Sequence, residues 1–335
     1  MSDSQPVVVA VPAVPVRRAP TALAGVIWLV GLIVLTFVAM GVGVAIAPQL
    51  LSGRSLGFGL DLALPLAAMA LIATLLLALG AVDLSIGSLM ALTSVTIGLL
   101  APDLGVGVAA AVAVLMSVVV GLINGLVTGI SRIHSAIVTL GALALLRGIA
   151  YALSGNEMLR VEDAAGLNSG ILNWVTLILA LVLTVGLAFG LSRSRSRDLA
   201  HGSDDTGVAR VLWLVVLFTL SGLFSGLAGV SLTGRLGVGS MTLGTGYETI
   251  VIGVALLGGV ALGRGVSSQT PLAIVGTLVA VAAFSIVNSA LLVVGSSGTI
   301  LEVLKGALIL AGVIASSAYH WIWDRIAAPR IVVRS

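Results

Sequence analysis

The sequence has no cysteine, a single lysine and few charged residues of either sign. Without cysteine, disulfides, thiolate metal sites and cysteine nucleophiles are excluded. Charged residues make up 9% of the 335 residues, whereas a soluble domain carries about 25%. So few charges cannot cover a surface that faces water. Most of the surface must therefore face the lipid bilayer.

Sequence motifs for nucleotide hydrolysis and metal binding are also missing. The only lysine, Lys305, does not follow a glycine-rich phosphate-binding loop. The three histidines are scattered and lack the spacing of metal ligands. We therefore expect no enzymatic activity, no metal and no cofactor in this chain. Any ATP and magnesium would have to be bound by a partner subunit.

Long apolar runs dominate what is present. Hydrophobic residues make up 59% of the chain, the mean hydropathy is +1.23, and 42 residues are glycine. The runs are continuous rather than alternating, which favours helices over a membrane β-barrel. About ten segments approach the roughly 20 residues that cross a bilayer. They lie near 22–47, 60–80, 84–101, 104–130, 135–153, 171–191, 211–232, 246–262, 270–294 and 298–318. The third and eighth are short and bordered by glycine, so either could be re-entrant or unwound.

The basic residues predict how these segments cross the membrane. With the N-terminus in the cytoplasm and ten crossings, eleven arginines fall inside and only three outside, a bias typical of cytoplasmic loops. The inner ones are Arg17, Arg18, Arg132, Arg193, Arg195, Arg197, Arg210, Arg264, Arg325, Arg330 and Arg334. The outer ones are Arg54, Arg160 and Arg235. We therefore predict an all-α membrane protein with both termini cytoplasmic. Its transmembrane domain would span residues 21–320, between tails at 1–20 and 321–335.

Glycines at four-residue spacing predict close helix packing. Gly121, Gly125 and Gly129 form one such ladder, and Gly222 and Gly226 form another. On a helix this spacing gives a flat face that allows two backbones to approach.

Ionisable residues inside apolar segments are costly unless they face a cavity or a partner. Glu302 and Lys305 lie three apart and can pair on one helix face. Asp83 and Glu248 follow glycine breaks, where each could cap a helix. Arg147 has no acid nearby in the sequence, so we expect it either to pair across helices or to meet a solute hydroxyl.

Polar residues within or next to the apolar segments are the candidate solute contacts. They are Asp83, Ser85, Asn124, Thr139, Arg147, Glu248 and Asn288. The neutral members could equally bond neighbouring helices.

Four segments in order resemble permeases of ribose-type ABC importers, within the wider branched-chain amino acid permease superfamily. They are LALGAVDLSIGSLMAL, NGLVTGISRIHSAIVTLGALALLRGIAYALSG, LSGLFSGLAGVSLTGRLGVGSMTLGTGYETIVIGVALLGGVALGRG and LLVVGSSGTILEVLKGALILAGVIAS. Together they cover most of residues 60–318. The resemblance implies an inner-membrane subunit that moves a small polar solute, most naturally a monosaccharide, by alternating access. It also implies three kinds of partner: two ABC ATPase subunits, a periplasmic solute-binding protein and a second permease subunit. No nucleic acid is expected.

The resemblance further implies that a cytoplasmic loop couples the permease to its ATPase. That loop corresponds to residues 192–210 here, which are also conspicuous by length and charge. The coupling candidates are Ser196, Arg197, Asp198, Leu199, Ala200, Gly202, Asp204 and Gly207. The loop is about four residues shorter than the family pattern and lacks its paired alanines. A specialised ATPase or a heterodimeric pore would account for this departure.

Two alternatives remain open on the sequence. The chain could carry a branched-chain amino acid or a nucleoside, as a permease of the same superfamily. It could also be an ion-coupled secondary carrier, which needs no ATPase and uses intramembrane acids such as Asp83 and Glu248.

Overall fold

The computed structural model describes residues 22–131, 133–167, 170–201, 206–260, 262–263, 265–267, 270–295 and 298–326. Within these residues the chain forms ten α-helices, as the apolar runs predict. They are α1 (Ala22–Ile46), α2 (Gly53–Ala78), α3 (Ile86–Leu104), α4 (Val106–Ser131), α5 (Ser135–Ser154), α6 (Gly170–His201), α7 (Thr206–Leu236), α8 (Tyr247–Leu257), α9 (Thr270–Val293) and α10 (Gly298–Ile326). Short 3₁₀ helices lie at Pro48–Leu51 and Ala164–Leu167. Eight helices of the described part are long and apolar enough to cross a membrane, while α8 has only 11 residues.

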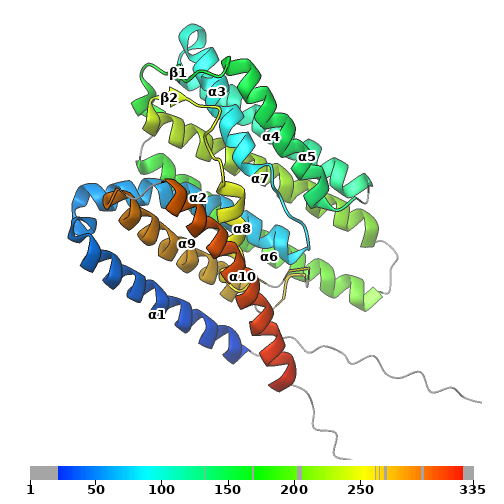
Figure 1. The fold of residues 1–335 in the computed structure, drawn as a ribbon. Helices are drawn as coiled ribbons and strands as arrows, with labels where there is room; N and C mark the ends of the chain where they lie inside the picture. Colours follow the sequence, from blue (N-terminus) through cyan, green and yellow to red (C-terminus); the bar gives the residue numbers. More distant parts are fainter. Residues whose placement is uncertain are drawn as a thin grey trace, which may run out of the picture.

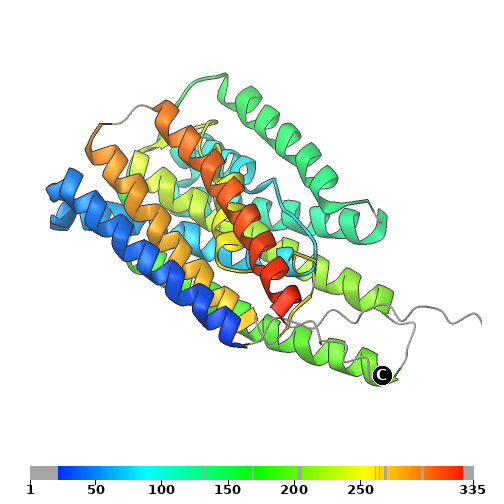
Figure 2. The ribbon, with the colours of Figure 1, turned by 60° about the horizontal axis from the view of Figure 1, so that its bottom comes forward.

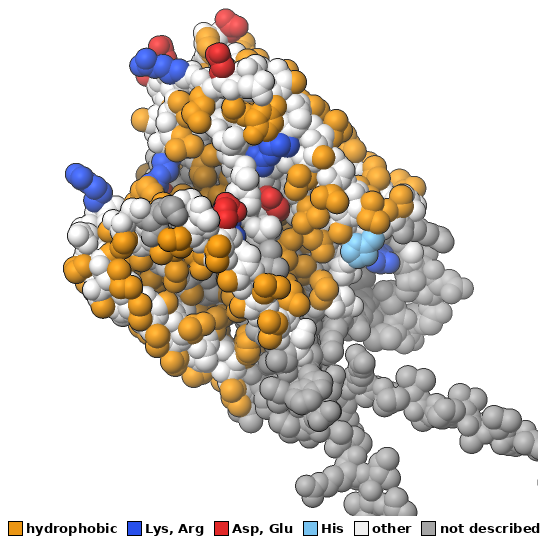
Figure 3. Space-filling view, in the orientation of Figure 1, with side chains coloured by type: hydrophobic (Ala, Val, Ile, Leu, Met, Phe, Trp, Pro, Cys, Tyr) orange, Lys and Arg blue, Asp and Glu red, His pale blue; other side chains and the backbone are white. Residues whose placement is uncertain are grey.

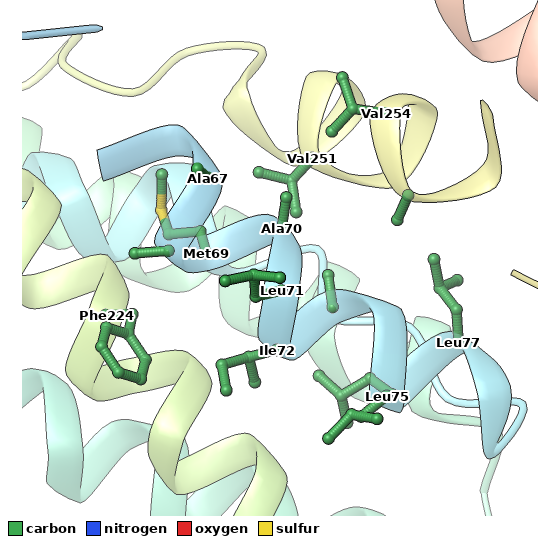
Figure 4. Packing of buried hydrophobic residues seen from close by; sticks show 14 of the residues in the cluster. Ala67, Met69, Ala70, Leu71, Ile72, Leu75, Leu77, Phe224, Val251 and Val254 are labelled. Carbon is green, nitrogen blue, oxygen red and sulfur yellow. The ribbon is translucent and has the colours of Figure 1, made fainter. Parts of the chain in front are cut away.

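The centre of the bundle is α2, which other helices surround (Figure 1). Its residues from Leu64 to Ala78 are all buried. Figure 4 shows Leu71, Ile72 and Leu75 of this helix packed among side chains of neighbouring helices, including Phe224 of α7 and Val251 of α8. Helix α2 is therefore enclosed by protein, although its sequence is as apolar as that of a lipid-facing span.

Helices α1, α5 and α10 lie at the periphery and pack on fewer neighbours than α2 does. Helix α1 packs mainly on α9, and α10 packs mainly on α8, so that α1, α9 and α10 lie in a row (Figure 2). On the other side of the bundle, α5 packs on α3 and, less extensively, on α4. Most of the outward side of α5 thus has no neighbour within the described chain.

The glycine ladders place α4 directly against α7, the most extensive helix pair in the structure. Gly121 and Gly222 face each other: a Cβ on Gly121 would lie 3.1 Å from the Gly222 Cα. A Cβ on Gly125 would lie 2.7 Å from the Cα of Val215. The prediction that these glycines form a close helix contact is confirmed.

A small antiparallel sheet ties two loops together at one end of the bundle. Strand β1 (Leu159–Arg160) pairs with β2 (Val238–Gly239), with Leu159 opposite Gly239. Both segments belong to loops that the charge bias assigns to the outside, and Figure 1 shows them together at the top of the molecule. Their pairing agrees with the alternation of crossings that the sequence predicts.

Candidate functional site

The chain leaves helical geometry between α2 and α3, at residues 79–85. Gly80 has φ +76°, a conformation that suits glycine and turns the chain out of α2. The N–H of Val82 then donates to the Ser135 hydroxyl at 2.8 Å, and the N–H of Leu84 donates to the Thr139 hydroxyl at 3.0 Å. Backbone groups inside a bilayer must be bonded within the protein. The two hydroxyls of α5 therefore hold this extended segment against that helix.

Asp83 lies at the centre of a buried hydrogen-bonded cluster. Its Oδ1 accepts from the N–H and the hydroxyl of Ser85, at 2.9 and 2.6 Å. Its Oδ2 accepts from the hydroxyl of Ser221 on α7 at 2.7 Å. The amide of Asn124 on α4 donates to the Ser85 hydroxyl at 3.0 Å. Three of the sequence candidates, Asp83, Ser85 and Asn124, thus come together where α3 begins.

These contacts favour a positioning role for the Asp83 cluster. The Asp83 side chain is only 3% exposed, and each of its carboxylate oxygens already accepts from a serine. The cluster links the start of α3 to α4 and α7, while Thr139 links the same segment to α5. The proposed cap at the start of α3 takes the form of Asp83 accepting the Ser85 N–H.

Arg147 reaches from α5 to the segment that precedes α8. One of its terminal nitrogens donates to the carbonyls of Met241 and Leu243, both at 2.9 Å. The side chain is half-buried. Arg147 was expected to pair across helices, and its partners are these two backbone carbonyls. Its other guanidinium N–H groups can still donate to a ligand.

Glu248 lies in the first turn of α8 with only part of its bonding capacity used. Its Oε1 accepts from the N–H of Gly246 at 3.3 Å, in the capping role expected. Its Oε2 is buried and has no hydrogen-bond partner within the described chain. Gly87 of α3 makes room for it, because a Cβ there would collide with Oε2 and with the Gly244 carbonyl. A buried carboxylate oxygen without a donor is costly, and a ligand hydroxyl could supply one.

Lys305 and Glu302 join α10 to the same region. They form an ion pair of 2.6 Å, as their spacing predicts, and Lys305 also donates to the Thr245 carbonyl at 3.3 Å. Figure 3 shows hydrophobic side chains over most of this face, with charged side chains at its upper end and left edge and a few more in its middle. Arg147 and Lys305 thus donate to carbonyls of the segment 240–248, which ends at Glu248. With Glu302, which pairs with Lys305, the region holds two charges of each sign.

Asn288 is separate from the other candidates. It is half-buried on α9, which packs on α1, α2 and α8. None of the hydrogen bonds described for the other six candidates reaches it.

The coupling candidates lie at the junction of α6 and α7. Ser196, Arg197, Asp198, Leu199 and Ala200 fall in the last turns of α6, which runs as a helix to His201. Gly207 is exposed in the first turn of α7. Gly202 and Asp204 lie outside the described residues. Their role in coupling stays a prediction.

The sequence interpretation missed Ser135 and Ser221, which hold the segment 79–85 from α5 and α7. The spacing of Ser135 and Thr139, one helical turn apart, was the available signal, because residues four apart share a helix face.

Comparisons with known proteins agree with the helical membrane architecture. The model of the "Branched-chain amino acid transport system / permease component" family matches residues 55–313. The L-arabinose transport system permease protein AraH of Escherichia coli K12 is 33% identical over 271 residues, covering 76% of this chain and 80% of AraH. No solved structure matches the chain at a significant level.

Two further relatives broaden this group. The probable ABC transporter permease protein YphD of E. coli K12 is 30% identical, covering 72% of this chain and 75% of YphD. The autoinducer 2 import system permease protein LsrC of Yersinia pestis (strain Pestoides F) is 29% identical, covering 58% and 59%. These relatives are permease components rather than enzymes. The chain therefore belongs to the permease family of ABC importers described as the branched-chain amino acid transport system permease component, in the branch that includes sugar permeases.

Proposed function

We propose that this chain is the membrane subunit of an ATP-driven importer for a monosaccharide in a bacterial inner membrane. The observation that carries the proposal is the polar group around 240–248. It holds donors from Arg147 and a buried Glu248 oxygen that has no donor among the described residues, beside the largely uncovered helix α5. A neutral polyol needs such hydrogen bonds and no net charge. The names of the arabinose and autoinducer 2 relatives support a solute of this kind.

The proposed mechanism is alternating access. A periplasmic solute-binding protein would deliver the sugar, a second permease subunit would complete the pathway, and ATP binding to a partner ATPase would reorient the helices. A branched-chain amino acid is the second candidate, because the family description names that class of solute.

The direct test is uptake of labelled L-arabinose into vesicles that contain the chain, its ATPase and its binding protein. We expect uptake only with ATP inside, and no competition from leucine. Uptake driven by a proton or sodium gradient without ATP would contradict the importer proposal. ATP-dependent uptake of leucine would contradict a sugar as the solute but would leave the importer proposal intact.

Replacing residues 196–205 by a Gly/Ser stretch of equal length should abolish copurification of the ATPase. The reason is that this charged segment is the proposed binding site for the ATPase subunit. The matched control replaces residues 327–335, which the charge bias assigns to the same side, and should retain the ATPase. Copurification that survives the first replacement would remove this segment from the coupling role.

Arg147→Ala is expected to lower ATP-driven uptake by roughly tenfold to a hundredfold, because a hydrogen bond from a charged group contributes about 1.5–3 kcal/mol. The measurement is the initial uptake rate at equal amounts of assembled protein. Arg160→Ala, at the exposed position of strand β1, is the control and should leave uptake unchanged. Normal uptake by Arg147→Ala would show that the arginine does not contact the solute, and loss of assembly would make its role structural.

A further inference from the structure

A cavity lies away from the Arg147 region, at the opposite end of the bundle from the β1 and β2 strands. Its volume is about 740 Å³. It is formed by the end of α4, the start of α5, the start of α7 and the turn at Gly80. The charge bias of the sequence assigns this end to the cytoplasm. Three of its lining residues, Gly207, Val208 and Arg210, belong to the predicted coupling loop 192–210, and Ser135 also holds the segment 79–85.

Three polar side chains of this cavity, those of Thr128, His134 and Arg210, can each donate a hydrogen bond to a ligand. Thr128 is 7% exposed, and its buried hydroxyl has no hydrogen-bond partner among the residues that the structure describes. His134 accepts the Ala136 N–H on Nδ1 at 3.3 Å, so the neutral ring carries its proton on Nε2 and can donate there. Arg210 adds a guanidinium, and no acidic side chain lines the cavity among the described residues. Such a set is suited to an anion.

Ser135 also lines the cavity, where its hydroxyl accepts the Val82 N–H. The rest of the lining consists of glycines and apolar side chains and continues to the surface. Ile130 is 71% exposed, Val208 is 65% exposed and Ile133 is 48% exposed, and all three line the cavity. In a helix bundle of this hydropathy, exposed aliphatic side chains at the end of a span meet lipid acyl chains. A ligand that fills this cavity should therefore carry a negative headgroup joined to an apolar tail.

We propose that this cavity binds an anionic phospholipid of the cytoplasmic leaflet. The phosphate accepts hydrogen bonds from the Thr128 hydroxyl, the His134 ring and the Arg210 guanidinium, while an acyl chain lies against Ile130, Ile133 and Val208. Basic pockets between transmembrane helices on this side are suited to lipid phosphates. The site adjoins the start of α7, which follows the predicted coupling segment, so lipid bound there would brace that helix.

The test measures binding of phosphatidylglycerol and phosphatidylcholine to the purified full chain by native mass spectrometry. We expect tighter binding of phosphatidylglycerol, weakened about fivefold by Arg210→Gln, since one basic residue near the surface contributes about that factor. Thr128→Val should weaken binding to a similar extent, whereas Thr128→Ser, which retains the hydroxyl, should not. Arg193→Gln is the matched control. It removes an exposed arginine that the charge bias assigns to the same side, where it stacks on Phe189 rather than lining the cavity.

Several results would overturn the proposal. Equal weakening by Arg193→Gln and Arg210→Gln would reduce the effect to general surface charge. If Thr128→Val binds the lipid as tightly as the unsubstituted protein, the lipid does not bind in this cavity. The comparison of Thr128→Val with Thr128→Ser still tests the proposal if Arg210→Gln does not fold. Displacement of the lipid by equal concentrations of inorganic phosphate would make free phosphate the ligand. If adding the ATPase displaces the lipid, the cavity is a binding surface for the ATPase rather than for lipid.

Discussion

Gly222→Val is expected to prevent α4 and α7 from packing and to destabilise the protein by about 3 kcal/mol or more. A Cβ at this position would collide with the Ser117 carbonyl of α4 and lie 3.1 Å from the Gly121 Cα. The obstructing atoms are backbone atoms, so a change of side-chain rotamer cannot relieve the clash. The two helices would have to separate along the most extensive contact of the bundle.

The measurement is thermal unfolding of the purified protein in mild detergent, followed by size-exclusion chromatography. Gly186→Val is the matched control. It adds the same side chain to α6, where a Cβ meets no atom within 4 Å. The control should unfold at the temperature of the unsubstituted protein. If both variants are equally stable, the glycine ladder does not determine the packing of α4 on α7.

Asp83→Ala is expected to destabilise the protein by about 3 kcal/mol, because a buried donor left without an acceptor costs about 1–3 kcal/mol. The substitution removes the acceptor of the Ser85 N–H, the Ser85 hydroxyl and the Ser221 hydroxyl. The two hydroxyls can turn to other acceptors, whereas the backbone N–H of Ser85 cannot. Unfolding temperature and ATP-driven uptake should fall together.

Asp83→Asn separates positioning from direct contact with the solute. The amide oxygen can still accept from Ser85, and the amide nitrogen can donate to the Ser221 hydroxyl. We expect near-normal stability and uptake for this variant. A stable Asp83→Asn protein that no longer transports would contradict the positioning role and return Asp83 to the solute pathway.

Helix positions could be predicted from the sequence because their signal is strong and local. The boundaries differ where helices continue into polar sequence. Helix α2 begins at Gly53 rather than near residue 60, and α6 continues to His201 rather than ending near residue 191. Hydropathy reports only the part of a helix that lies in hydrocarbon. Neither glycine nor proline interrupts the stretch 191–201, so the helix continues past the apolar run.

The candidate site could be predicted only in part, for a similar reason. The Glu302–Lys305 pair follows from spacing on one helix. The partners of Arg147 are backbone carbonyls 94 and 96 residues away, and carbonyls leave no signature in side-chain identity. The bond between Ser221 and Asp83 joins residues 138 positions apart. A serine in an apolar helix has many alternative partners, so its actual one emerges only from the packed bundle.

The enclosure of α2 means that two helices of similar hydropathy obey different rules of mutational tolerance. In the most apolar window of α1, 11% of residues are buried, against 78% for α2. At most positions of α1, leucine, isoleucine, valine and phenylalanine are interchangeable, because lipid adapts to any of their shapes. At Leu71 or Ile72 the same exchanges alter a close-packed interior, where volume and branching decide the outcome. Among related natural sequences, we therefore expect α1 to keep its hydrophobicity while its residues change, and α2 to keep the size of its residues as well.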